Sequence, residues 1–383
     1  MTLGIAIARA GLLAGVLLAA VECAGQFLAV GPTNIEFTAT ADMPNATGVQ
    51  EISVGVVGSG QLGFKLAGVV LMPGAVGPNP LVISPATGTA PATVLVALNP
   101  NVVQYLSSGV YRFAVEFAMP GQSSPPYAAT FVTLELAPPP PPSVTSLVSA
   151  ASLQPTVSPG EIVSIFGANI GTPPVSAQYD DTGLYPTALG NTTVTFNGTA
   201  AALLFVSTTQ INAVVPYEVA GQKTVDVVVT HNFVAAPSVS VPVVDTSPGI
   251  FTTTQTGKGQ GAILNATGPG ASTPNSVDNP SPTGSGVAIF ATGGGLLNQA
   301  VQDGSIILEV LEPPGFVPAA PVSLTIGGQP AKILYAGAAP YEVAGMLQIN
   351  ATVPNGIGSG AQPVVLTIGA NNNASQQVTV AVK

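Results

Sequence analysis

The chain has 383 residues, of which only 6% are charged, and its formal net charge of −10 includes just seven Lys and Arg. So few cations cannot follow a phosphate backbone or hold an anionic membrane surface, which excludes nucleic acid and such membranes as partners. One histidine and one cysteine also leave too few ligands for a zinc site.

The composition favours an all-β fold. Helices on a water-exposed surface need Lys, Glu and Arg, whereas this chain has 44 Gly, 37 Pro and 46% apolar residues. Val, Thr, Ile, Phe and Tyr between clusters of Gly, Pro, Asn and Ser are typical of short strands joined by turns. We therefore predict three tandem immunoglobulin-like β-sandwich domains with an uncharged polar surface.

Residues 1–25 have the pattern of a secretory signal peptide. Arg9 supplies a positive charge, and residues 10–21 form an apolar run too short to span a bilayer. Small residues precede Gln26, so we predict cleavage before it. A lipid anchor on Cys23 is the alternative, although Glu22 is not the small residue such sites favour. Cleavage leaves a mature chain with no cysteine and no membrane span.

Residues 26–137 are predicted to form the first domain, with about seven strands. Pro and Gly clusters separate segments of alternating polarity. Five strands are marked by period-two alternation, at residues 34–39, 51–56, 93–98, 110–117 and 129–136.

A family resemblance appears in this domain. The sequence Ile-Ser-Pro-Ala-Thr-Gly-Thr-Ala-Pro-Ala-Thr-Val at 83–94, followed by Leu-Ser-Ser-Gly-Val-Tyr at 106–111, resembles the BACON-type bacterial Ig-like domain. Leu81 lies near the point where that family usually has a tryptophan, and this chain has none. The resemblance implies a β-sandwich and binding of carbohydrate or mucin.

A run of five prolines at 138–142 follows the first domain. Five prolines adopt the stiff polyproline II conformation, which extends by roughly 3.1 Å per residue. The run is therefore predicted to be a linker between domains.

Residues 143–245 and 246–383 are predicted to be two copies of one domain. The heptapeptide Gln-Ile-Asn-Ala-Val-Val-Pro at 210–216 returns as Gln-Ile-Asn-Ala-Thr-Val-Pro at 348–354. Three further pairs of segments match, at 162–166 with 286–290, 194–201 with 324–331, and 225–229 with 364–368. The second copy also carries a long polar segment, 252–285, which is either an ordered loop or a flexible tip.

The two copies together resemble the acidobacterial C-terminal domain known from Solibacter-type proteins, which is similar to IPT/TIG sandwiches. The resemblance covers 143–383, and it implies export and a modular Ig-like tail but no reaction. Its matching residues are 148–152, 158–160, 247–251, 259–262, 335–340 and both Gln-Ile-Asn segments.

Candidate catalytic and metal-binding residues are few. His231 is the one possible base for a Ser/His/Asp hydrolase, but no Gly-x-Ser-x-Gly motif accompanies it; we interpret it as an exposed loop residue near a strand end. Asp180-Asp181 and Asp278-Asn279 could supply oxygens to calcium, yet they lack the spacing of a calcium loop. We predict no catalytic, cofactor-binding or metal-binding residue.

Two further sets of polar residues are candidates for a catalytic or sugar-binding site. Glu218 and Glu342 lie in identical Pro-Tyr-Glu-Val-Ala-Gly segments and could be glycosidase carboxylates. One segment follows its heptapeptide and the other precedes it, so we interpret both as surface carboxylates near a domain junction. Strand alternation places the heptapeptide amides, Gln210 with Asn212 and Gln348 with Asn350, on one face. They could pin loops, which we favour, or bind sugar hydroxyls.

The sequence thus predicts an exported, non-enzymatic protein of the cell surface or periplasm. We expect a binding or adhesion module for glycans or envelope polymers, with no cofactor. A purely structural spacer is the alternative, and a secreted glycosidase is a further one of another class. An aromatic strip that uses Tyr105, Tyr111 or Tyr127 would support glycan binding by the first domain.

Overall fold

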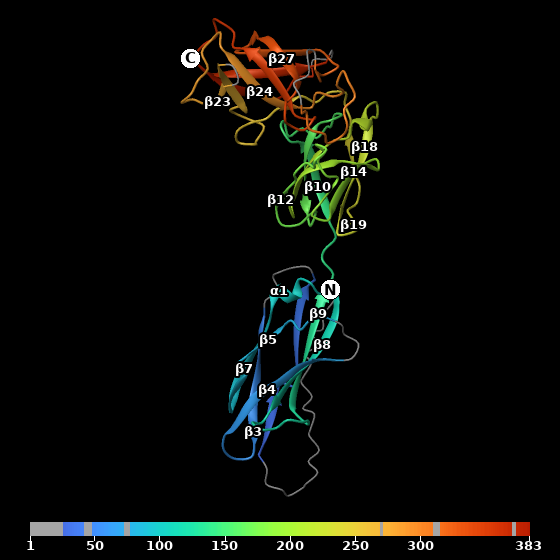
Figure 1. Cartoon of the computed structure of the whole chain (residues 1–383), viewed down its shortest axis with the longest axis vertical. Coiled ribbons are helices and arrows are strands. Elements are labelled where there is room, and N and C mark those ends of the chain that lie inside the picture. The colour runs from blue at the N-terminus through green and yellow to red at the C-terminus, as the bar shows by residue number, and fades with distance from the viewer. Residues whose placement is uncertain (1–25, 42–47, 73–76, 269–270, 309–314, 370–372) are drawn as a thin grey trace, which may run out of the picture. The chain divides into compact units, whose positions relative to one another are not determined.

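The computed structural model describes residues 26–41, 48–72, 77–268, 271–308, 315–369 and 373–383. The predicted leader, with Cys23, lies outside them. Regular structure in the described residues is almost entirely β, which confirms the predicted fold class (Figure 1). The chain divides into two compact units, unit 1 (Met1–Pro139) and unit 2 (Pro140–Lys383), and the division falls within the proline run. No described helix has the length and apolar character to cross a membrane.

Unit 1 is a sandwich of two sheets. Their strand orders are β1-β3-β7-β5 and β2-β9-β8-β4-β6, and β2 pairs with β9 in parallel. A short helix, α1 (Pro100–Val103), follows β7. The strands are β1 (Phe27–Gly31), β2 (Asn34–Thr40), β3 (Val49–Val57), β4 (Leu62–Leu71), β5 (Leu81–Ser84), β6 (Thr87–Ala90), β7 (Ala92–Leu98), β8 (Gly109–Ala118) and β9 (Ala128–Ala137).

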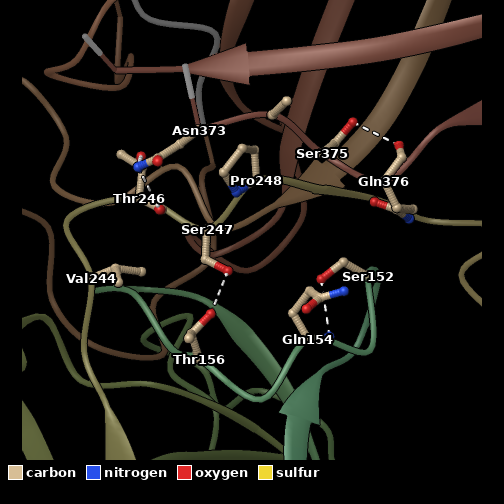
Figure 2. A pocket seen from close by; sticks show the side chains of 11 residues that line it. Ser152, Gln154, Thr156, Val244, Thr246, Ser247, Pro248, Asn373, Ser375 and Gln376 are labelled. Carbon is tan, nitrogen blue, oxygen red and sulfur yellow. Dashed lines mark hydrogen bonds between the residues drawn. The ribbon is translucent and has the colours of Figure 1, made fainter. Parts of the chain in front are cut away.

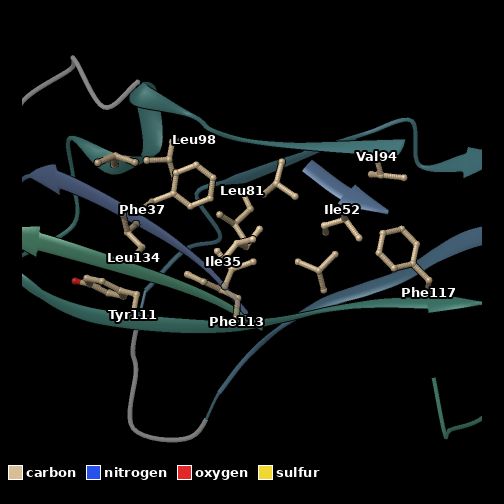
Figure 3. Packing of buried hydrophobic residues seen from close by; sticks show 14 of the residues in the cluster. Ile35, Phe37, Ile52, Leu81, Val94, Leu98, Tyr111, Phe113, Phe117 and Leu134 are labelled. Carbon is tan, nitrogen blue, oxygen red and sulfur yellow. The ribbon is translucent and has the colours of Figure 1, made fainter. Parts of the chain in front are cut away.

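All five strands predicted from alternation in unit 1 are present, as β2, β3, β7, β8 and β9. Their inward residues, such as Ile52, Phe113 and Leu134, fill one core between the sheets (Figure 3). The described residues of unit 1 contain nine strands where about seven were predicted. β4 gave no alternating signal because its pairing with β8 shifts at a bulge between Leu66 and Gly68.

The two largest hydrophobic cores of unit 2 lie one in residues 143–245 (repeat 1) and one in 246–383 (repeat 2). The sheets of repeat 1 have the orders β10-β11-β17-β16-β12 and β13-β14-β18-β19, with β15 and β20 beside β14 and β18. Its strands are β10 (Ser143–Ser149), β11 (Ile162–Ala168), β12 (Val175–Ser176), β13 (Ala188–Leu189), β14 (Thr192–Phe196), β15 (Thr199–Ala200), β16 (Ala202–Val206), β17 (Gln210–Val214), β18 (Thr224–His231), β19 (Val234–Ala235) and β20 (Val239–Pro242).

Repeat 2 has sheets of order β23-β22-β24-β28-β27 and β26-β25-β29-β30, with β21 beside β24. The 3₁₀ helix η1 (Tyr217–Val219) belongs to repeat 1. The strands of repeat 2 are β21 (Gly249–Ile250), β22 (Ile263–Gly268), β23 (Ala271–Pro274), β24 (Gly286–Thr292), β25 (Val322–Ile326), β26 (Gln329–Pro330), β27 (Lys332–Ala338), β28 (Leu347–Thr352), β29 (Gly360–Ile368) and β30 (Val378–Val382).

The two repeats share their central strand pairing. Ile165 of β11 opposes Ile211 of β17, and Ile289 of β24 opposes Ile349 of β28. The next strand in each sheet carries the same bulge, between Leu203 and Phe205 in β16 and between Ile333 and Tyr335 in β27. Equal pairing, down to a shared bulge, is what a duplicated sequence predicts, because register follows the hydrophobic pattern.

The polar segment 252–285 contains a hairpin, β22–β23, and asparagines fasten the described residues around it. Asn275 is buried, and its amide donates to Asn265 Oδ1 at 2.8 Å and to the Ala381 carbonyl at 2.9 Å. It also accepts from the Ala381 amide at 2.8 Å and from Gln260 Nε2 at 2.9 Å. These bonds fasten the segment to β30. The sequence left open an ordered loop or a flexible tip, and these residues are ordered.

Asn275→Ala is expected to lower the free energy of unfolding of unit 2 by about 2 kcal/mol, because buried polar groups of Ala381 and Asn265 lose their partner. Urea unfolding followed by circular dichroism measures the change. Asn355→Ala removes an exposed asparagine of the same repeat and should cost less than about 0.5 kcal/mol. Equal effects of the two substitutions would contradict the role of Asn275.

Candidate functional site

Repeats 1 and 2 meet in a small apolar contact that we call the seam. Ile162, Ala202 and Val214 of repeat 1 are buried against Val343 of repeat 2. Tyr185 and Leu204 from repeat 1, and Phe251 and Met346 from repeat 2, pack around them. The outward faces of β11, β16 and β17 are apolar here because the second repeat covers them.

Polar bonds fix the seam in one arrangement. Thr292, at the end of β24, accepts from the Ile162 amide at 2.9 Å and donates to the Gly345 carbonyl at 2.8 Å. A Cβ on Gly345 would lie 2.2 Å from the Gly160 carbonyl oxygen, so the two backbones touch at this point. Farther along, the Tyr217 amide donates to Asp303 Oδ1 at 3.0 Å. The two repeats therefore form one body rather than two linked by a hinge.

A hollow of about 520 Å³ lies beside the seam, and we call it the seam pocket (Figure 2). Repeat 1 supplies one wall and repeat 2 the other. Hydroxyl and amide side chains make up most of the lining, and no charged residue lies in it. Its residues are Ser152, Gln154, Thr156, Val244, Thr246, Ser247, Pro248, Asn373, Ala374, Ser375 and Gln376.

Several lining groups also hold the walls in place. The Thr156 and Ser247 hydroxyls lie 3.4 Å apart across the pocket (Figure 2). Gln376 Nε2 donates to the Ala151 carbonyl of the opposite repeat at 3.1 Å, and Asn373 Nδ2 donates to Thr246 Oγ1 at 3.0 Å. The exposed Gln154 contributes a polar side chain to the lining. The pocket is thus preformed, which lowers the entropic cost of binding a ligand.

A buried carboxyl group, Glu161, lies behind this wall. Its Oε2 accepts from the amide and hydroxyl of Ser158 at 2.8 and 3.1 Å. Within the described chain Oε1 has no hydrogen-bond partner. Burial raises the pKa of Glu161 to about 8, although the nearby hydroxyls of Ser149, Ser158 and Ser247 oppose the rise. A neutral acid at pH 7 explains how the group is tolerated, because an ionised one would be buried without a cation.

Sequence reasoning did not single out Glu161, because its Ser-Pro-Gly-Glu segment has the pattern of an ordinary turn before a strand. Comparison of the two repeats could have drawn attention to Glu161. At the offset of 124 residues that aligns β11 with β24, Ser285 stands in place of Glu161. The fold of the repeat therefore does not require a carboxyl group at this position.

The heptapeptide amides lie on one strand face, as predicted, with Ile211 and Ile349 buried on the other. Within the described residues their amides make no bond to a loop backbone. Gln210 Nε2 donates to Asn212 Oδ1 at 2.9 Å, and Gln348 Nε2 donates to Asn350 Oδ1 at 2.8 Å. Each pair is thus joined along its own strand, which corrects the loop-pinning interpretation.

Glu218 and Glu342 are both exposed beside the seam, as predicted. Each has a different neighbour. Glu218 contacts Asp303. Burial raises the pKa of Asp303 to about 6, and both the hydrogen bond with Glu218 and the charge of Glu218 add to the rise. Burial raises the pKa of Glu342. Burial also raises the pKa of Tyr185, and the charge of Glu342 adds to that rise. Glu218 and Asp303 are in hydrogen-bond contact, so their carboxyl groups lie closer together than the roughly 5–10 Å that separates the two catalytic carboxyl groups of a glycosidase.

The remaining candidates have structural roles. His231 ends β18 half-buried, with Nδ1 2.9 Å from Thr192 Oγ1, so the exposed-loop interpretation was wrong. Asp180 accepts three bonds from Thr182 and Leu184, which lower its pKa. Asn279 donates to Thr273 and Pro274. Among the described residues no cluster of three or more His, Cys, Asp or Glu is placed to hold a metal.

The three tyrosines proposed as an aromatic strip lie apart. Tyr111 is buried in the core of unit 1, and its hydroxyl donates to the Ser107 carbonyl at 2.9 Å, in the manner of a tyrosine corner. Tyr105 is 79% exposed just beyond α1. Tyr127 precedes β9 and adjoins Phe117, at the opposite end of β8 from Tyr111. They therefore form no shared surface.

Comparisons with known proteins add little. No family model matches the sequence, and no curated protein matches it either. Among solved structures, SGBP-B of the Bacteroides ovatus mixed-linkage glucan utilization locus, in complex with a mixed-linkage heptasaccharide, is similar with 13% identity and a TM-score of 0.27, over 95% of this chain and 71% of that one.

A putative membrane-anchored protein of Corynebacterium diphtheriae is similar with 10% identity and a TM-score of 0.21, over 92% of this chain and 91% of that one. The E. coli chaperone DraB shares 11% identity, with a TM-score of 0.21, over 57% of this chain and 97% of that one. Likenesses at these TM-scores carry no inference about what this chain binds.

Proposed function

We propose that the chain is an exported, non-enzymatic protein of the cell surface or periplasm, and that unit 2 binds a neutral glycan in the seam pocket. The observation that carries this proposal is the lining of the pocket. Hydroxyl and amide groups converge from two repeats on a hollow of about 520 Å³, a volume within the usual range of ligand sites.

The chemistry of the lining favours an uncharged, hydroxyl-rich ligand. An anionic ligand would find no cation in the pocket, and an apolar ligand would displace water from the exposed Gln154 amide without replacing its hydrogen bonds. Sugar hydroxyls both donate and accept, which suits the mixture of Ser, Thr, Asn and Gln. The proposed export of the chain would place this site where envelope and environmental polysaccharides are found.

The resemblances found in the sequence belong to the same proposal. We propose a BACON-like domain at 26–137 and an IPT/TIG-like pair of acidobacterial type at 143–245 and 246–383. In unit 1 the predicted sugar-binding tyrosines are dispersed, so we assign the glycan site to unit 2.

A purely structural spacer is the second candidate. It is favoured by the bond from Gln376 to the Ala151 carbonyl, because this bond holds the two repeats together whether or not a ligand binds. The spacer role predicts that no glycan is retained.

A glycan array probed with the purified chain tests the proposal, followed by titration of the best ligand. The double variant Gln154→Ala/Thr156→Val should weaken binding about tenfold, because two ligand hydrogen bonds at roughly 0.5–1.5 kcal/mol each are lost. Gln302→Ala removes an exposed glutamine elsewhere in repeat 2 and should leave the affinity unchanged. Retention of no glycan, or equal binding by all three proteins, would reject the seam pocket as the site.

A further inference from the structure

Resting on the proposed function, we infer that the seam pocket is one end of a longer groove, and that this groove binds the interior of an unbranched, neutral polysaccharide chain. The seam pocket is followed by two further hollows of about 300 and 290 Å³. Each shares one lining residue with its neighbour. Thr246 belongs to the first and second hollows, and Leu296 to the second and third.

The three hollows follow the line on which the repeats meet. The second lies between Gly221 of repeat 1 and Ala319 of repeat 2. The third lies between Tyr217, whose amide is bonded to Asp303, and Leu297. The Tyr217 bond to Asp303 fixes one wall of the third hollow, and both hollows are present without a ligand. A rigid row of adjoining hollows suits a polymer better than a single small molecule.

The lining changes character along the row. The seam pocket is polar, whereas Leu296, Ala320 and Val301 make the second and third hollows mostly apolar. A polysaccharide offers both surfaces in turn, with hydroxyl groups at the ring edges and C–H groups on the ring faces. Contact of the ring faces with Leu296, which is 48% exposed in the free protein, would remove apolar surface from water.

The charges along the row select the class of polymer. Asp245 lines the second hollow and Glu218 the third, while no Lys or Arg lines any of the three. Asp303 lies beside Glu218. Polymers that carry carboxylate, sulfate or phosphate groups would be repelled by these side chains. The groove therefore fits neutral chains such as unsubstituted glucans, xylans and mannans.

The test compares chain lengths and blocks one hollow. The purified full chain is titrated with di- and hexasaccharides of cellulose, mixed-linkage β-glucan, xylan and mannan, with a hexagalacturonate as the anionic probe. We expect at least one neutral hexasaccharide to bind tenfold or more tighter than its disaccharide, and the hexagalacturonate not to bind. Ala319 is exposed and lines only the second hollow, so Ala319→Trp blocks the groove and spares the seam pocket.

Ala319→Trp should reduce hexasaccharide affinity to that of the disaccharide and leave disaccharide affinity unchanged. Gln302→Trp, at an exposed position outside the hollows, is the matched control and should change neither. Circular dichroism confirms that both variants fold. Equal affinity for short and long chains, or a hexasaccharide indifferent to Ala319→Trp, overturns the groove while the seam pocket stands. Failure of every sugar to bind overturns both.

Discussion

Glu161→Gln is expected to make unit 2 more stable than the wild type at pH 8, by on the order of 4 kcal/mol. The wild-type carboxyl group has a pKa of about 8 when folded, because it is buried, and an ordinary value near 4.5 when unfolded. Between these values the folded state keeps a proton that the unfolded state releases, so stability falls as pH rises, by up to about 1.4 kcal/mol per pH unit.

The sign follows from which state binds more protons. Below pH 4.5 both states are protonated and no stability is lost, and above pH 8 the loss is complete. Glutamine is neutral throughout and can still accept from the Ser158 amide, so its variant should lose much less stability between pH 5 and pH 8. The smaller loss that remains comes from Asp303, whose pKa is raised to about 6, and from Glu342. Urea unfolding at pH 5 and pH 8, followed by circular dichroism, measures the difference.

Two controls accompany this measurement. Unit 1 lacks Glu161, so its unfolding transition should be the same in both proteins. Asp181→Asn neutralises an exposed carboxylate of repeat 1 and should leave the pH dependence of unit 2 as it is in the wild type. If wild-type unit 2 proved equally stable at pH 5 and pH 8, Glu161 would have to be ionised or exposed in solution, contrary to its burial here.

Gly345→Ala is expected to destabilise the seam by roughly 3 kcal/mol or more. The new methyl group would lie 2.2 Å from the Gly160 carbonyl oxygen and 3.3 Å from side chains of Ile162 and Val214. Backbone cannot move aside as a flexible side chain can, so the repeats must separate. The bond from Thr292 to the Gly345 carbonyl would weaken with them.

Hydrogen exchange measured by mass spectrometry resolves this effect by segment. Amides at the seam, such as those of Ile162 and Tyr217, should lose protection in Gly345→Ala while the cores of both repeats keep theirs. Gly358→Ala is the matched control, because an added Cβ there meets only Gln362 at an ordinary 3.5 Å. Unchanged protection at the seam in Gly345→Ala would show that the two repeats do not touch as described.

Much of the fold could be predicted from sequence because alternation and turn residues act locally. The segment 194–200 illustrates this: β14 and β15 flank a turn in which Asn197 and Gly198 adopt positive φ angles of 47° and 87°. The heptapeptides likewise placed Ile211 and Ile349 in equivalent core positions. Strand β4 was missed, since its bulge interrupts the two-residue period.

The candidate site was harder to predict, because it is built between repeats rather than within one. Ser152 and Asn373 lie more than 200 residues apart in the sequence, and no local pattern says that they line one pocket. The hydrogen bond along each Gln/Asn pair depends on side-chain conformation, which alternation does not specify. Glu161 resembled a turn carboxylate until packing of the second repeat was known.

The position of a bound sugar tests the central claim most directly. A crystal structure of the chain with the best-binding neutral oligosaccharide should show a sugar ring in the seam pocket, within hydrogen-bond distance of Gln154 and Asn373, with the chain continuing past Thr246 toward Leu296. An oligosaccharide seated on unit 1, or on a face of unit 2 away from the seam, would contradict the account.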